Sequence, residues 1–105
     1  MNIIFEVSTT NYEKDIEFVT NALEDLQKLC ETENGYKFGK PVSRFGWTFF
    51  KLWITPNFFF KIDEEFSDMI KKAKGRKQNE KFTNFMSDFF ASKECSVKLK
   101  ITEED

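Results

Sequence analysis

Hydrophobic and polar residues alternate along three stretches of the chain, and each stretch predicts a β-strand. Residues 2–8 and 96–102 each have one apolar face. Residues 44–54 differ, because large side chains occupy both faces: Thr48, Phe50, Leu52 and Ile54 alternate with Trp47, Phe49, Lys51 and Trp53. A half-buried strand needs only one apolar face, so the second row of rings requires its own explanation.

Apolar residues recur every three or four positions in the first segment between these strands. Residues 12–30 carry one such stripe, which predicts a helix of about five turns. Thr10 and Glu13 have the spacing of a capping box at its start. Residues 33–35, Glu-Asn-Gly, predict its end, because Asn and Gly readily adopt positive φ.

The middle of the chain carries weaker patterns. Residues 36–42 predict an edge strand, since Gly and Pro interrupt them, and residues 43–46 predict the turn that follows. Residues 58–60 are three consecutive Phe, which either extend a strand or fill the core from a loop. Helical spacing returns in residues 63–74 and 78–92.

The predicted order is therefore strand, helix, strand, strand, helical region and strand, followed by a frayed tail at 103–105. This order matches the βαββαβ plan of the ferredoxin-like fold, a four-stranded antiparallel sheet with helices mainly on one face. The second crossover is long enough for an extra helix, and a rival arrangement places that helix on the other face. At 105 residues we expect a single α+β domain, residues 1–105.

Composition indicates a soluble globular chain, with 40% hydrophobic and 32% charged residues. The net charge of −2 argues against a dedicated nucleic-acid-binding protein but leaves room for a local basic patch. The start does not resemble a signal peptide, and no apolar run approaches about 20 residues, so we expect a cytoplasmic location without membrane contact. The abundance of Lys, Asn, Ile and Phe indicates an AT-rich genome, such as that of a phage or mobile element.

The sequence offers little for catalysis. It contains no histidine, which removes Ser-His-Asp and Cys-His systems and His-ligated zinc. Its four glycines are isolated, so no phosphate-binding glycine loop is present. Cys30 and Cys95 are expected to be free thiols. We therefore predict no enzyme activity, no cofactor and no metal; the alternative is a Mg²⁺-dependent nuclease using Asp63–Glu65 and Asp88.

Three hypotheses explain the second aromatic row. Trp47, Phe49 and Trp53 either fill a core beneath a further helical layer, form an exposed contact for a protein partner, or stack on single-stranded nucleic acid. A homodimer that buries this face is a variant of the second hypothesis. The candidate contact residues are Trp47, Phe49, Lys51, Trp53, Lys98, Lys100, Arg76 and Lys77.

The segment Gly46–Leu52 resembles the central-strand motif of RNA recognition motifs. The resemblance implies base stacking on Trp47 and Phe49, with lysines of the last strand beside them. The segment departs from that motif in three respects. Its basic residue, Arg44, stands one place further upstream, Trp47 replaces Phe or Tyr, and Thr48 stands where the family has Gly or Ala. In the first strand, Glu6 stands where the family prefers an apolar residue.

Two charged regions lie outside the aromatic strand. The basic run 71–77 favours a solvated helix end, or alternatively a contact with phosphate or an acidic partner through Arg76 and Lys77. The acidic side of helix 12–30 favours a solvated surface, or alternatively mimicry of nucleic-acid phosphates. The sequence thus predicts a small non-catalytic protein-binding module, an inhibitor or adaptor acting by occlusion on a host machine. The alternative is a single-stranded RNA- or DNA-binding domain; the partner's identity does not follow from the sequence.

Overall fold

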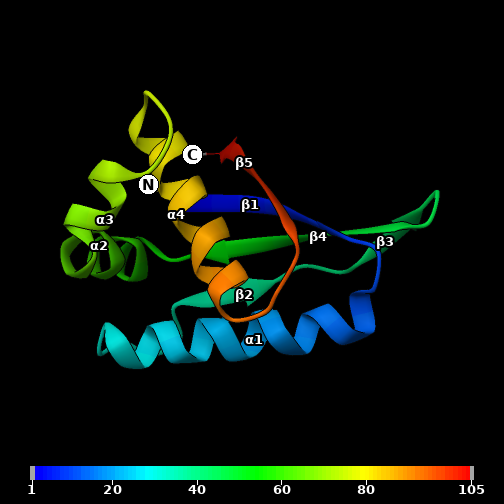
Figure 1. Ribbon diagram of the computed structural model, residues 1–105. Helices are drawn as coiled ribbons and strands as arrows, with labels where there is room; N and C mark the ends of the chain where they lie inside the picture. The colour runs from blue at the N-terminus through cyan, green and yellow to red at the C-terminus, as the bar shows by residue number, and fades with distance from the viewer. Residues whose placement is uncertain (1, 105) are drawn as a thin grey trace.

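The computed structural model describes residues 2–104 (Figure 1). Within them the chain is an α+β protein with one five-stranded antiparallel sheet and four helices. In chain order the elements are β1 (Asn2–Thr9), α1 (Tyr12–Leu29), β2 (Tyr36–Phe38), β3 (Val42–Arg44), β4 (Trp47–Ile54), α2 (Pro56–Glu65), α3 (Ser67–Lys72), α4 (Gln78–Ser92) and β5 (Lys98–Glu104).

The strand order places β4 and β1 at the centre of the sheet. β2, β4, β1 and β5 are neighbours in that order, and β3 also pairs with β4. β2 and β3 lie end to end along the same edge of β4, because Tyr36 pairs with Ile54 and Arg44 pairs with Trp47. The predicted edge strand is therefore at the edge, but it consists of two short strands.

A bulge separates these two strands. Phe38 pairs with Leu52 and Val42 with Phe49, so the three residues 39–41 face the two residues 50–51. The Gly39 amide still donates to the Lys51 carbonyl at 2.8 Å. The bulge therefore keeps one ladder hydrogen bond. It also shifts by one residue which side chains of the strand face each side of the sheet, so that odd-numbered residues of β2 and even-numbered residues of β3 share a side.

One face of the sheet forms the hydrophobic core. Alternate residues of β1 and β4, such as Phe5 and Leu52, are fully buried there. All four helices contribute buried side chains to the same cluster, including Leu23 of α1, Phe58 of α2 and Phe82 of α4, with Ile70 of α3. Figure 1 shows α1 running along one side of the sheet. The prediction of helices on one face agrees with this packing.

The capping of α1 differs from the prediction at both ends. Its N-cap is Asn11, whose side-chain oxygen accepts from the Lys14 amide at 3.4 Å, whereas the predicted capping box placed Thr10 there. At the other end Asn34 has the positive φ that was predicted, but the second residue with positive φ is Glu31 and not Gly35. Gly35 is needed for space instead, because an added Cβ would lie 2.4 Å from the Phe58 ring.

The second crossover contains three helices. Residues 58–60 belong to α2, which corrects both predicted alternatives: Thr55 accepts from the Phe58 amide at 3.2 Å and Pro56 occupies the first turn. The predicted helix over 63–74 is interrupted at Phe66, between α2 and α3. The helix over 78–92 is confirmed as α4, and β5 extends to Glu104, so only Asp105 of the predicted frayed tail lies outside the described residues.

Candidate binding surface on the open sheet face

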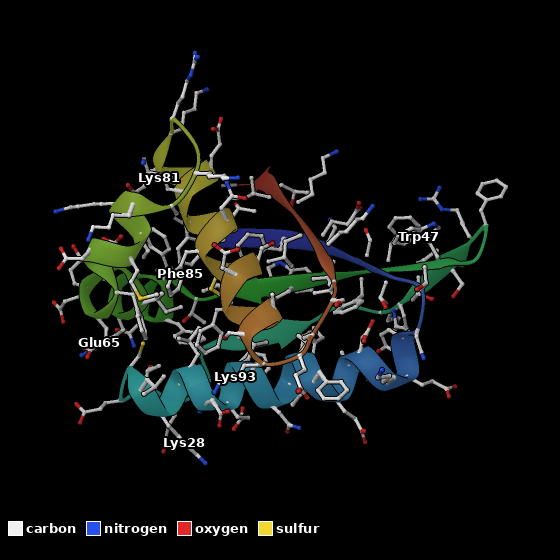
Figure 2. All side chains as sticks on the ribbon, viewed as in Figure 1. Lys28, Trp47, Glu65, Lys81, Phe85 and Lys93 are labelled. Atoms are coloured by element: carbon white, nitrogen blue, oxygen red, sulfur yellow. The ribbon has the colours of Figure 1, made fainter. Side chains whose placement is uncertain are left out.

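The side of the sheet opposite the core faces outward. Residues paired across β4, β1 and β5 share this side, so Trp53, Ile4 and Thr102 form one row across the three strands, and Phe49, Ser8 and Lys98 form another. We call this surface the open face, and it comprises Ile4, Glu6, Ser8, Lys37, Gly39, Val42, Arg44, Trp47, Phe49, Lys51, Trp53, Lys98, Lys100 and Thr102. Figure 2 shows Trp47 on the side of the sheet away from α1.

The three aromatic residues of the open face are half-buried. Trp47, Phe49 and Trp53 all have intermediate exposure, and no helix in the described part of the chain packs over them. Ile4, directly opposite Trp53, is only 3% exposed. The hypothesis that a further helical layer buries these rings is therefore wrong, since α2, α3 and α4 all pack into the core on the other side.

Each of these rings has a cation over it. The Lys98 Nζ lies 5.1 Å from the centroid of Trp47, and the Arg44 Cζ lies 5.4 Å from that of Phe49. The Lys37 Nζ lies 6.0 Å from the ring of Trp53. Such contacts stabilise by about 0.5–1 kcal/mol at exposed sites. The cations come from β2 and β3, which precede β4 in the chain, and from β5 at the far end of the sequence, so three other strands supply the charges over the rings.

Charge is unevenly distributed over the molecule. The described side chains of the open face include five cations and one carboxylate, Glu6, which gives 5 − 1 = +4. Because the whole chain carries −2, the remaining residues carry −2 − 4 = −6. Glu6 pairs in the register with both Lys51 and Lys100, so it lies within a row of positive charge. The open face is therefore a local basic patch on an acidic protein.

The bulge adds a hollow at the edge of the open face. It has a volume of about 260 Å³ and is lined by Lys40, Arg44 and Lys51 together with Phe49 and Trp53. The indole of Trp53 lies against the backbone of Gly39, since a Cβ there would be 3.0 Å from the ring. Glycine at the bulge thus sets how deeply this indole sits in the sheet.

The β3–β4 hairpin ends in a residue that sequence reasoning missed. Phe45 is 99% exposed and has a positive φ of 53°. The available signal was an aromatic residue before Gly46, at a turn position where Asn, Asp or Gly is usual. The predicted turn began earlier, at residue 43, because β3 was not foreseen.

Six of the eight predicted contact residues come together on the open face. Arg76 and Lys77 do not, because they lie in the exposed loop between α3 and α4, which Figure 1 shows at the other end of the molecule from the β3–β4 hairpin. That loop is ordered by local contacts. The Arg76 amide donates to the Glu80 carboxylate at 2.9 Å, and the Lys81 Nζ donates to the Lys71 carbonyl at 2.9 Å.

Other reactive groups lie apart from this surface. Cys30 and Cys95 are free and buried, as predicted. Burial raises the pKa of Cys95 from 9.0 to about 11, with a smaller contribution from Asp15, so its thiol is protonated at neutral pH. Asp63, a candidate Mg²⁺ ligand, accepts a hydrogen bond from Gln78 at 3.0 Å. Across residues 2–104 no group of three or more His, Cys, Asp or Glu side chains has the geometry to hold a metal ion.

The comparisons with known proteins return nothing that resembles the chain. No family model, no curated protein and no solved structure matches it. None of the helices in the described residues has the length and apolar character needed to cross a membrane. The class of protein is therefore defined by its own geometry: an α+β protein with one sheet face packed by helices and the other exposed, basic and aromatic.

Proposed function

We propose that the chain is a non-catalytic binding module whose open face binds single-stranded nucleic acid. The observation that carries this proposal is the cation lying over each of the rings of Trp47, Phe49 and Trp53. Proteins that bind single strands without strong sequence preference combine aromatic stacking surfaces with positive charge along the backbone path. The open face supplies both within one strand and its neighbours.

The local arrangement explains how such binding proceeds. A base that stacks on an indole or phenyl ring displaces the cation above it, and that cation is then free to contact a nearby phosphate. Stacking contributes about 1–3 kcal/mol per base, and each neutralised phosphate releases counterions. Charge near the contact dominates at physiological ionic strength, because the Debye length is about 8 Å. The net negative charge of the whole chain therefore does not oppose binding at this face.

A protein partner is the second candidate, and the partial burial of the rings favours it. Side chains that lie nearly flush with the surface, surrounded by charged residues, resemble the centre and rim of a protein interface. The occupant would be an acidic surface, and the module would act as an inhibitor or adaptor by occlusion on behalf of a phage or mobile element. A homodimer joined through this face is disfavoured, because it would oppose five cations of one copy to five of the other.

Architecture and location form a further part of the proposal. If β2 and β3 count as one bulged strand, the order edge strand, β4, β1, β5 corresponds to the ferredoxin-like plan. The two buried free thiols support a reducing, cytoplasmic location.

The decisive experiment measures binding of fluorescently labelled single-stranded DNA and RNA of about 20 nucleotides by anisotropy at low salt. We expect log K to fall with log salt at a slope of about −0.7 per phosphate contacted. The double variant Lys98→Glu, Lys100→Glu should weaken binding at least about tenfold at equal salt. The matched control is Lys28→Glu with Lys72→Glu, which makes the same charge change at exposed sites on α1 and α3 and should leave affinity nearly unchanged.

Failure of the wild-type chain to bind either oligonucleotide at low salt would reject the nucleic-acid proposal. The protein alternative is then tested by affinity capture from lysate of the source cells with wild-type, Trp53→Ala and Lys28→Glu baits. A partner of the open face is retained by the first and third baits and lost from the second. Circular dichroism must show that Trp53→Ala remains folded.

A further inference from the structure

The tip of the β3–β4 hairpin carries an aromatic ring with no contact to the rest of the protein surface. Arg44 pairs with Trp47, so the two residues between them, Phe45 and Gly46, form the turn. Phe45 is 99% exposed, more than any other large hydrophobic residue identified as exposed in the chain. Its ring therefore contributes almost no buried apolar surface to the folded state.

The backbone at this position also disfavours phenylalanine. Phe45 has a φ of 53° and Gly46 a φ of 79°, the pair of positive values that a type I′ turn requires. The left-handed conformation costs a residue with a Cβ roughly 1–2 kcal/mol, and Asn-Gly is the preferred sequence for this turn. Phe45 is thus unfavourable for the turn and gains nothing from burial.

The hairpin presents this ring on an ordered arm. The Ser43 and Thr48 hydroxyls are 3.0 Å apart across the two strands, and the Arg44 guanidinium lies over the ring of Phe49. The register of β1 with β4 ends at Thr9 and Thr48, so the tip extends beyond β1. Figure 1 shows the hairpin projecting past the N-terminal end of α1. The backbone that carries the ring is therefore ordered before a ligand binds, and binding has to order only the side chain.

We propose that Phe45 is the terminal stacking ring of the open face, where a bound single strand leaves the sheet and continues onto the hairpin. The inference rests on the proposed function. Phe45 is joined to Trp47 through Gly46 at the turn that begins β4, and Arg44 and Lys98 provide positive charge at this end of the face. The positive charge here favours a phosphate-bearing strand over an uncharged apolar pocket in a protein.

The length of the surface fixes the length of the ligand. Six residue steps of β4 separate Trp53 from Trp47, which corresponds to about 20 Å of strand, and the two-residue turn places Phe45 roughly one step further. At about 3.4 Å per nucleotide, the shortest spacing along one strand, this path accommodates at most about 7 nucleotides. Affinity should therefore rise with oligonucleotide length up to about 7 nucleotides and then increase only slowly.

The test compares Phe45→Asn with Phe45→Tyr, using fluorescein-labelled oligothymidylates of about 4 and about 8 nucleotides. Asn suits the turn and lacks the ring, so Phe45→Asn should raise the melting temperature by about 4 °C and weaken binding of the longer probe about tenfold. Phe45→Tyr keeps the ring and should match the wild-type chain in both measurements. A variant that is more stable yet binds less tightly cannot be explained by loss of folding.

Three outcomes would overturn this inference. If Phe45→Asn binds the longer probe as tightly as the wild-type chain does, the ring does not contact the strand. If the same substitution lowers the melting temperature, Phe45 supports the hairpin and its exposure needs no ligand. If the wild-type chain binds neither probe at low salt, the proposed function fails, and the role of Phe45 in it fails as well.

Discussion

Individual side chains determine how the open face is shaped. The position of the Trp53 indole depends on the absence of a side chain at Gly39, where an added Cβ would lie 3.0 Å from the ring. Ile4 is buried beside Trp53 although no helix covers that side within the described residues. One glycine and one aliphatic residue therefore fix the depth of an indole whose exposed part is available to a ligand.

At the residue scale, Cys95 should make the stability of the fold vary with pH in the alkaline range. Burial raises the pKa of its thiol from 9.0 to about 11. Below pH 9 both states keep the proton; between pH 9 and 11 the unfolded chain loses it while the folded chain retains it. The free energy of unfolding should therefore fall as pH rises through this window, and the protein should lose about 2–3 kcal/mol of stability in total.

Urea unfolding of wild-type and Cys95→Ala chains under reducing conditions measures this contribution. The substitution costs stability at neutral pH because it leaves a small cavity. The loss of stability between pH 9 and 11 should nevertheless be smaller in the variant than in the wild-type chain. Parallel curves for the two chains would show that the Cys95 thiol titrates normally in the folded state.

At the scale of elements, sequence patterns predicted those helices and strands whose periodicity is uninterrupted. α4 was predicted with its observed boundaries, because apolar residues recur every three or four positions from Gln78 to Ser92. Residues 58–60 were not placed in a helix, since three consecutive Phe have no period. The start signal was nevertheless present: Thr55 followed by Pro56 is an N-cap and first-turn pair.

Local sequence patterns could not predict which face of the sheet stays open. Trp47, Phe49 and Trp53 have the composition of a buried face, and only the packing of α2, α3 and α4 on the other side leaves them exposed. That packing depends on Phe58, Phe82 and Phe90, which lie outside β4. The rings were predicted from one strand, whereas the cations over them come from three others.

Lys81 of α4 connects α4 to the end of α3. The Lys81 Nζ donates to the carbonyls of Lys71 and Ala73 at 2.9 and 3.3 Å, at the C-terminal end of α3. Lys81→Met should remove both hydrogen bonds and cost about 1–3 kcal/mol. Amides of residues 67–73 should exchange faster with deuterium, as measured by mass spectrometry.

Lys77→Met is the matched control for this experiment, because Lys77 is an exposed lysine of the adjoining loop. Its exchange rates and melting temperature should stay close to those of the wild-type chain. Equal effects of the two substitutions would mean that the two carbonyl contacts do not hold α3 in place.

At the scale of the whole molecule, net positive charge and both tryptophans are located on the open face. Trp47 and Trp53 are the only tryptophans in the chain, and each has a lysine over its ring. Tryptophan fluorescence, excited where tyrosine does not absorb, therefore reports on this face alone. Each ion's quenching constant is divided by its value for free tryptophan amide, because caesium is intrinsically the weaker quencher. The normalised constant should be roughly threefold larger for iodide than for caesium at equal ionic strength, because the local potential attracts anions.

The double variant Lys37→Glu, Lys98→Glu should reverse this preference, whereas Lys28→Glu with Lys72→Glu should preserve it. Stern–Volmer plots for both ions give the comparison without any knowledge of the ligand. If the normalised quenching constants of caesium and iodide are equal for the wild-type chain, the basic character assigned to the open face is wrong.

The bulge at residues 39–41 has a consequence for how the protein can associate. Pro41 has no amide hydrogen, and the irregular backbone around it cannot continue a regular ladder with an incoming chain. This border of the sheet is therefore protected against strand addition and the fibrous aggregation that can follow. Recognition is left to side chains on the flat surface, which can change by single substitutions without altering the scaffold that holds them.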